Sequence, residues 1–180
     1  MSRLKQPGAP LQPRRLAAWA SGVTDLLIAL PAGADLMTGL VEALADRGIE
    51  QAGLVLLSGE LRAASFMTGR PDVSGHRIAT HAGPWDLAGP LRLLGGNAIL
   101  GRGAESCALL HCHAVFATPE GRLRGGHLRP GHCPLGSGGL RALAACPQGA
   151  GFQVAEDSET NFSIFHPFRL AAGGTQEVLR

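Results

Sequence analysis

The sequence predicts an α+β domain in which one main helix, at about residues 34–47, covers a mainly antiparallel β-sheet. Apolar residues recur at helical spacing in this segment, where Leu36, Leu40 and Leu44 share a face and Gly48 follows as a helix stop. Asp35 is expected in the first turn, where a negative charge favours the helix dipole. Most of the remaining chain consists of short apolar runs separated by glycine and proline, which is typical of strands and turns.

The expected strands follow the short apolar runs in order. The first strand region, about residues 15–30, ends at Pro31. Residues 52–57 are predicted to be a buried strand, and residues 61–67 to return beside it. Residues 69–90 hold three prolines and four glycines and are predicted to be a loop-rich connection. Further strands are expected at about residues 91–100, 106–117, 122–129, 140–146, 151–156 and 161–165.

A tight hairpin is predicted where residues 106–117 turn into residues 122–129. In Thr118-Pro119-Glu120-Gly121, proline suits the first corner of a type I turn, and glycine suits the left-handed residue that follows. This combination is the signature of a three-residue hairpin loop, which pairs Thr118 with Arg122. A two-residue loop, with Ala117 opposite Arg122, is the alternative register. A bulge at Gly125-Gly126 would also change the register.

Three histidines converge if the three-residue loop forms. That register sets His113 opposite His127, and strand alternation places His111 on the same face as His113. In the two-residue register His127 would instead lie beside Cys112, and the cluster would scatter. The opposite face of the strand is apolar and suited to a core, with Leu110, Cys112, Ala114 and Phe116.

Three neutral imidazoles with no fourth protein ligand nearby match the ligand set of an open zinc site. Iron, manganese or nickel would also accept nitrogen ligands, so zinc is a preference among several metals. The alternative interpretation is that two surface histidines and one core histidine lie close together by chance. The sequence therefore predicts a metal site formed by His111, His113 and His127.

Charged residues near the hairpin are candidates for ligand contacts. Arg122 and Arg124 share a face if they lie on a strand, which would attract an anion; the solubility of an exposed edge strand is the alternative. The acidic residues Glu156, Asp157 and Glu159 could supply a general base to a metal-bound water, or form a solvated turn.

Three further histidines and one short motif have simpler interpretations. His76 and His81 are expected to be free surface histidines. His132-Cys133 could add ligands near the metal, although a turn position is preferred. Gly69-Arg70-Pro71 echoes the core of an AT-hook, but its flanking residues favour a simple turn.

Composition limits the class of protein. A chain of 180 residues is most simply one domain, and its 45% hydrophobic content suits a packed core. The formal net charge of +2 and the pI near 8.5 make the protein mildly basic, unlike a dedicated nucleic-acid binder with strongly clustered charge. There is no P-loop signature and no G-x-S-x-G nucleophile motif.

The sequence predicts a cytoplasmic protein with short ends outside the domain. Its four cysteines form no C-x-x-C pair, and no apolar stretch reaches the roughly 20 residues of a membrane span. Prolines and arginines interrupt the N-terminus before a signal-peptide core develops. Residues 1–13 are predicted to be a flexible leader, residues 14–168 one domain, and residues 169–180 a C-terminal tail that frays.

The motifs together resemble the plant-and-prokaryote conserved (PPC) domain family. The resemblance runs over about residues 14–166 and rests on Leu30 to Leu36, Gly53 to Leu61, Gly89 to Asn97, His111-Cys112-His113, and Gly121 to Leu128, which contains Gly-Gly-His-Leu. The chain departs from the family in two places. It reads Gly136-Ser137-Gly138 where the family usually has Thr-x-Glu, and Arg92 where an acidic residue is frequent.

The resemblance implies a strongly bent antiparallel sheet, a homotrimer and, in prokaryotic members, a metal held by residues matching His111, His113 and His127. The family is also distantly similar in fold to acetolactate decarboxylase, a three-histidine zinc enzyme. The expected function is that of a bacterial stand-alone, metal-binding protein with a regulatory or DNA-associated role and no AT-hook of its own, or a binding module for a small anion at the metal. A zinc-dependent lyase or hydrolase that acts on a small anionic carbonyl substrate is the alternative.

Overall fold

The computed structural model describes residues 5–10, 21–170 and 176–178. These residues form one nine-stranded sheet in the order β1-β6-β2-β5-β4-β3-β7-β8-β9, with one α-helix. The strands pair antiparallel, apart from one parallel pairing of β3 with β7. The predicted α+β class is confirmed. The elements are β1 (Val23–Leu30), α1 (Leu36–Ala45), β2 (Ala52–Pro71), β3 (Ala79–Arg102), a 3-10 helix (Ala104–Ser106), β4 (Ala108–Ala117), β5 (Leu123–Leu128), β6 (Leu135–Pro147), β7 (Ala150–Asp157), β8 (Phe162–Leu170) and β9 (Gln176–Val178).

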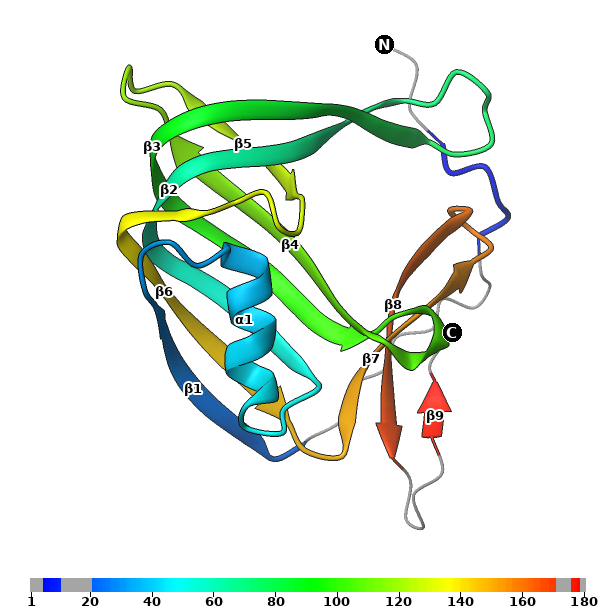
Figure 1. The fold of residues 1–180 in the computed structure, drawn as a ribbon. Helices are drawn as coiled ribbons and strands as arrows, with labels where there is room; N and C mark the ends of the chain where they lie inside the picture. The colour runs from blue at the N-terminus through cyan, green and yellow to red at the C-terminus, as the bar shows by residue number, and fades with distance from the viewer. Residues whose placement is uncertain (1–4, 11–20, 171–175, 179–180) are drawn as a thin grey trace.

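Four of the strands close into a small barrel. β2 pairs with β3, β3 with β4, and β4 with β5, while β5 returns to β2 at Phe66 and Met67. The long strands β2 and β3 bend through this ring and continue together as a two-stranded arm (Figure 1). Inside the ring, Phe66 and Phe116 pack edge to face with ring centroids 5.4 Å apart.

Helix α1 covers the core as predicted, with one refinement at its start. Asp35 is the N-cap rather than a first-turn residue, and its carboxylate accepts hydrogen bonds from the backbone N–H groups of Met37 and Thr38. The same carboxylate accepts from the N–H groups of Gly131 and Cys133, which ties the helix to the chain after β5. Among the described residues, no helix combines the length and the apolar run that a membrane span requires.

The predicted return of residues 61–67 beside residues 52–57 is wrong, because β2 is one continuous strand of 20 residues. Gly59 does not turn the chain but pairs with Leu93 on one side and Leu140 on the other. A Cβ atom at Gly59 would lie 2.7 Å from the carbonyl oxygen of Gly139. Glycine is therefore needed here because two strands approach closely. A glycine in this role cannot be told from a turn glycine by sequence alone.

The predicted loop over residues 69–90 is also wrong, since β2 continues to Pro71 and β3 begins at Ala79. Pro84 and Pro90 are absent from the paired positions and lie in the part of β3 that pairs with β2 alone. Proline is tolerated in a strand at irregular or edge positions, where no ladder hydrogen bond is lost. Proline chemistry alone therefore does not distinguish such a strand from a loop.

The C-terminal strands extend beyond the predicted ranges. β6 and β7 contain the expected strands at residues 140–146 and 151–156, and β8 begins one residue after the start of the strand expected at residues 161–165. The residues predicted to fray include the end of β8 and the short strand β9, which pairs with it. Residues 15–20 of the predicted first strand and most of the predicted leader lie outside the described residues. Within the leader, the N–H of Gly8 donates to the carbonyl oxygen of Glu159 over 3.0 Å.

Candidate metal centre

The β4–β5 hairpin has the predicted three-residue loop. The N–H of Thr118 donates to the carbonyl oxygen of Arg122 at 2.9 Å, and Gly121 takes the left-handed conformation with φ of 77°. The register pairs Ala117 with Leu123 and His113 with His127 without a shift between them. Neither the two-residue loop nor a bulge at the glycine pair occurs, because the turn residues fix the register.

Strand alternation sorts the side chains of β4 as expected. Leu110, Cys112, Ala114 and Phe116 are buried in the core, with exposed fractions of 6% or less. His111 and His113 lie on the opposite, exposed face, and His127 is partly buried beside them. Burial raises the pKa of the Cys112 thiol to about 12, so this cysteine stays protonated and packs in the core.

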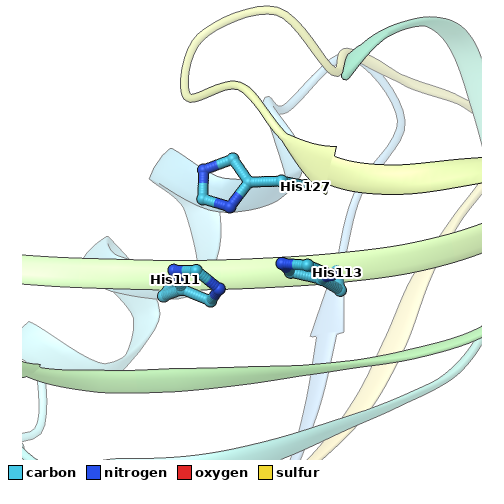
Figure 2. A group of neighbouring side chains, drawn as sticks. All are labelled: His111, His113 and His127. Atoms are coloured by element: carbon cyan, nitrogen blue, oxygen red, sulfur yellow. The ribbon is translucent and has the colours of Figure 1, made fainter. Parts of the chain in front are cut away.

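The three imidazole rings converge on one point. The ring centroids lie 4.9 Å apart for His111 and His113, 4.5 Å for His111 and His127, and 5.3 Å for His113 and His127. Figure 2 shows His111 and His113 side by side on β4, with His127 reaching toward them from β5. One ring nitrogen from each histidine can be chosen so that all lie within 4.8 Å of one another.

This geometry fits a metal ion with nitrogen ligands. Tetrahedral Zn–N bonds of about 2.0–2.1 Å place two ligand nitrogens roughly 3.4 Å apart. From separations of at most 4.8 Å, the rings would close by no more than about 1.4 Å, which small side-chain rotations supply. The buried Nδ1 atom of His127 has no hydrogen-bond partner within the described part of the chain. A buried nitrogen normally has a partner, and a metal ion would be one.

Electrostatics hold the three rings in the form that binds metal. Partial burial, followed by the neighbouring histidines, lowers the pKa of His111 and of His113 below the usual 6.5. The same causes lower the pKa of His127 to about 4. The rings are therefore neutral at neutral pH, and a metal ion need not displace protons from them.

A fourth histidine, His81, lies beside the triad. Its ring centroid is 5.6 Å from that of His127, and its charge contributes to the lowered pKa of all three triad histidines. This corrects the expectation that His81 is a free surface histidine. β2 pairs with β5 at Met67 and His127. The β2–β3 arm starts at this pairing, and in it His81 of β3 lies opposite Gly69 of β2. Sequence reasoning missed it because residues 69–90 read as a loop.

The structure separates the two candidate anion contacts. Arg122 belongs to the hairpin loop, where it lies near Glu120 and helps to lower the pKa of that carboxyl, after the Thr118 hydrogen bond. Arg124 pairs with Phe116, so it lies on the face of β5 opposite His127. A carboxylate held by Arg124 would therefore not be held at the triad face.

The other candidate ligands do not join the triad. The Cys133 thiol is fully buried and donates toward the carbonyl oxygens of Ser65 and Arg129. In the β7–β8 turn, the Asp157 carboxylate accepts hydrogen bonds from the Glu159 N–H and the Thr160 hydroxyl. No carboxylate of the described residues belongs to the group of converging ligand atoms.

The fold and the site define a β-rich domain that presents a three-histidine hairpin on a bent, partly closed sheet. The sequence matches the model of the Plants and Prokaryotes Conserved (PCC) domain over residues 20–137, which is more than half of the chain. The chain therefore belongs to this family, which is also written PPC, and the resemblance seen in the sequence is confirmed. A comparison with curated protein sequences finds no match.

Several solved structures share the fold. The metal-containing protein AF0104 from Archaeoglobus fulgidus is 20% identical with a TM-score of 0.66, and the match covers 84% of this chain and 99% of that one. A PPC protein from Pyrococcus horikoshii is 15% identical with a TM-score of 0.65, over 83% and 96% of the two chains. A Ralstonia eutropha protein described as a "Putative DNA-binding protein" is 18% identical with a TM-score of 0.61, over 77% and 88%. At these identities the likeness establishes the fold.

The lowered histidine pKa values predict that the metal-free protein loses stability in mild acid. Unfolded histidines titrate near 6.5, so between pH 6.5 and about 4 the unfolded chain binds more protons than the folded chain does. Stability is therefore expected to fall as the pH falls through this window. Thermal melts of chelator-treated protein across the window would measure this fall, and His127→Gln should flatten the pH dependence. An equally steep dependence in this variant would contradict the assignment.

Proposed function

We propose that the protein binds a divalent transition metal, zinc by preference, through His111, His113 and His127. The observation that carries the proposal is the convergence of three neutral imidazoles, one of which has a buried nitrogen without a partner. Three histidines with no fourth protein ligand match an open zinc site, in which water or a small ligand completes the coordination. The description of the Archaeoglobus neighbour as metal-containing supports this proposal.

Elemental analysis of purified protein would test the metal and identify it. Protein expressed without added metal is expected to carry zinc at a single ion per chain. Iron, manganese or nickel at that occupancy would keep the site but change its metal, because imidazole accepts all of these ions. Protein that takes up no transition metal after dialysis against each ion would overturn the proposal.

We further propose a regulatory or DNA-associated role in the cytoplasm. Two structural neighbours, from Ralstonia eutropha and Bacteroides thetaiotaomicron, are described as "putative" DNA-binding proteins, and the free cysteines suit a reducing compartment. An AT-hook is not the means, since Arg70 of the Gly69-Arg70-Pro71 motif is paired with Thr80 in the β2–β3 arm. Binding of duplex fragments should weaken steeply with salt. Unchanged mobility of the duplex at low salt would remove DNA from the proposal.

A zinc-dependent lyase or hydrolase is the second candidate. The observation that favours it is that the group of converging ligand atoms found among the described residues holds three histidines and no fourth protein ligand. The metal would supply Lewis acidity toward a small anionic carbonyl substrate. His81, whose ring lies beside that of His127, would be placed to hydrogen-bond a molecule held at the site. Turnover that is lost on chelation and restored by zinc would support catalysis, and turnover indifferent to chelator would exclude this site as its origin.

We also propose that the protein is a homotrimer, with the histidine face of the sheet inside the interface. A row of cross-strand neighbours runs over β1, β6, β2, β3, β4 and β5 on this face: Leu27, Leu143, Val55, Asn97, His113 and His127. The first three are exposed by 73%, 40% and 51%. An exposed apolar face that is continuous over three strands is typical of a surface that another subunit covers.

Charge placed in this row is expected to break the assembly. Leu143→Glu should convert a trimer into single chains, because a carboxylate would be desolvated at the centre of the apolar row. Light scattering coupled to gel filtration would measure the masses. Val73→Glu is the matched control, since Val73 is fully exposed in the loop between β2 and β3. A wild-type protein that elutes as a single chain, or a Leu143→Glu variant that stays trimeric, would count against this interface.

A further inference from the structure

A second candidate site lies where β2 and β5 part. The two strands pair at Phe66–Met67 with His127–Leu128, and beyond this point the β2–β3 arm and the β4–β5 hairpin separate. A cleft with a volume of about 530 Å³ opens between them. It is lined by residues of all four strands: Phe66 and Thr68 of β2, Trp85, Asp86 and Leu87 of β3, Val115 of β4, and Leu123, Arg124 and Gly125 of β5.

The walls of this cleft are mainly apolar and aromatic. Phe66 is buried and fixed by its edge-to-face contact with Phe116. The Trp85 indole is half-exposed, and its Nε1–H donates to the Thr68 hydroxyl at 3.1 Å. The hydrogen bond satisfies the polar end of Trp85 and ties its ring to the neighbouring strand. A fixed aromatic surface of this kind suits a flat, apolar ligand, because little side-chain entropy is lost on binding.

The cationic group in the wall is Arg124. One of its N–H groups donates to the carbonyl oxygen of Leu123 at 2.8 Å, and within the described residues no carboxylate forms an ion pair with it. The guanidinium carries five N–H donors, so enough remain to bind both oxygens of a carboxylate. Asp86 also lines the cleft, and its charge disfavours a second negative group on the ligand. A single carboxylate is the complementary charge.

We propose that this cleft binds a small aromatic monocarboxylate, with its ring against Trp85 and its carboxylate on Arg124. The volume lies within the range of about 300–1,000 Å³ that is usual for small-molecule sites, and the mouths of β-barrels are common places for them. Most of the lining is apolar, and one arginine and one hydroxyl give orientation. This composition is the usual one for such sites.

The cleft borders the metal centre, but its cationic side chain lies on the other face of β5. Val115 and Gly125 are each two residues from a triad histidine, which is roughly 7 Å along a strand. Arg124, however, leaves β5 on the face opposite His127. A carboxylate on Arg124 is therefore bound by the guanidinium and not by the metal, and binding should survive loss of the triad. A protein that binds no metal could therefore still bind the carboxylate, and a protein that binds metal could fail to bind it.

Calorimetric titration of naphthalene-2-carboxylate into the full chain tests the proposal. The neutral isostere naphthalene-2-carboxamide is titrated in parallel, and both are repeated with His113→Ala protein to exclude binding at a metal. The acid is expected to bind about tenfold more tightly than the amide, which is the usual value of one charge-assisted contact. Arg124→Gln should remove this preference, and Trp85→Ala should weaken both ligands.

The matched control is Arg122→Gln, two residues away in the hairpin loop and outside the cleft lining. It removes the same charge from the same hairpin and should leave both affinities unchanged. Equal losses in Arg122→Gln and Arg124→Gln would reduce the effect to overall charge and overturn the proposal. Absence of binding by wild-type protein at millimolar ligand would overturn it as well, and so would loss of binding in His113→Ala protein alone.

Discussion

His113→Ala is expected to abolish metal binding while leaving the fold intact. His113 pairs directly with His127 across β4 and β5, and its ring centroid lies 4.9 Å from that of His111 and 5.3 Å from that of His127. Two imidazoles alone hold a transition metal far more weakly than three. Loss of a mere supporting residue costs 10–100-fold in affinity, so loss of a ligand should exceed about a hundredfold. Metal content by elemental analysis would fall to background. The fold should persist, because His113 is exposed and its side chain supports no core packing.

His132→Ala is the matched control for this variant. His132 is also an exposed histidine, but it follows β5 in a turn and lies outside the converging group. Its replacement should leave the metal content at the wild-type level. Thermal melting of the metal-free proteins would show that both variants fold. Metal retained by His113→Ala at wild-type occupancy would mean that the ion binds elsewhere.

Gly125→Ala is expected to weaken metal binding although all three histidines remain. A Cβ atom at this position would overlap the carbonyl oxygen of Ala114 and lie 3.0 Å from the Cα of Val115. Both contacts are with the backbone of β4, so β5 must move away from β4 or twist. His127 would move with β5, away from its partner His113. We expect a loss of at least about tenfold in metal affinity, together with about 1–3 kcal/mol of stability from overpacking.

Gly53→Ala provides the control for a glycine substitution in a strand. Gly53 lies on β2, and a Cβ atom there would meet nothing within 4 Å. This variant should bind metal with wild-type affinity and should melt within a few degrees of the wild-type protein. Competition with a chromophoric chelator would measure the affinities. Wild-type affinity in Gly125→Ala would show that the spacing of the two strands does not set the site.

The candidate metal site could be predicted from sequence because its determinants are local. Pro119 and Gly121 select the loop, the loop fixes the register, and the register places His127 opposite His113. All of these residues lie within the 17 residues from His111 to His127, where turn chemistry and strand alternation act without help from the remaining chain. The buried face of β4 was predictable for the same reason.

The course of β2 and β3 could not be predicted in this way. Gly59 and the prolines at positions 84 and 90 have the local properties of turn and loop residues, yet they lie within two long paired strands. What keeps these segments extended is pairing with strands that are distant in the chain, including β6 and β5. The position of His81 followed from that pairing, and so it was missed.

The sequence by itself determined the helix, the core face of β4, and the hairpin that brings three imidazoles together. Tertiary structure alone decided that the β2–β3 arm carries His81 to the triad, that Arg124 faces a cleft rather than the triad, and that Leu27, Leu143 and Val55 form one exposed row. The physical reason is the range of the interactions. Turn geometry and alternation are fixed by neighbouring residues, whereas the pairing partners of a long strand depend on which distant segments can bury their apolar faces against it.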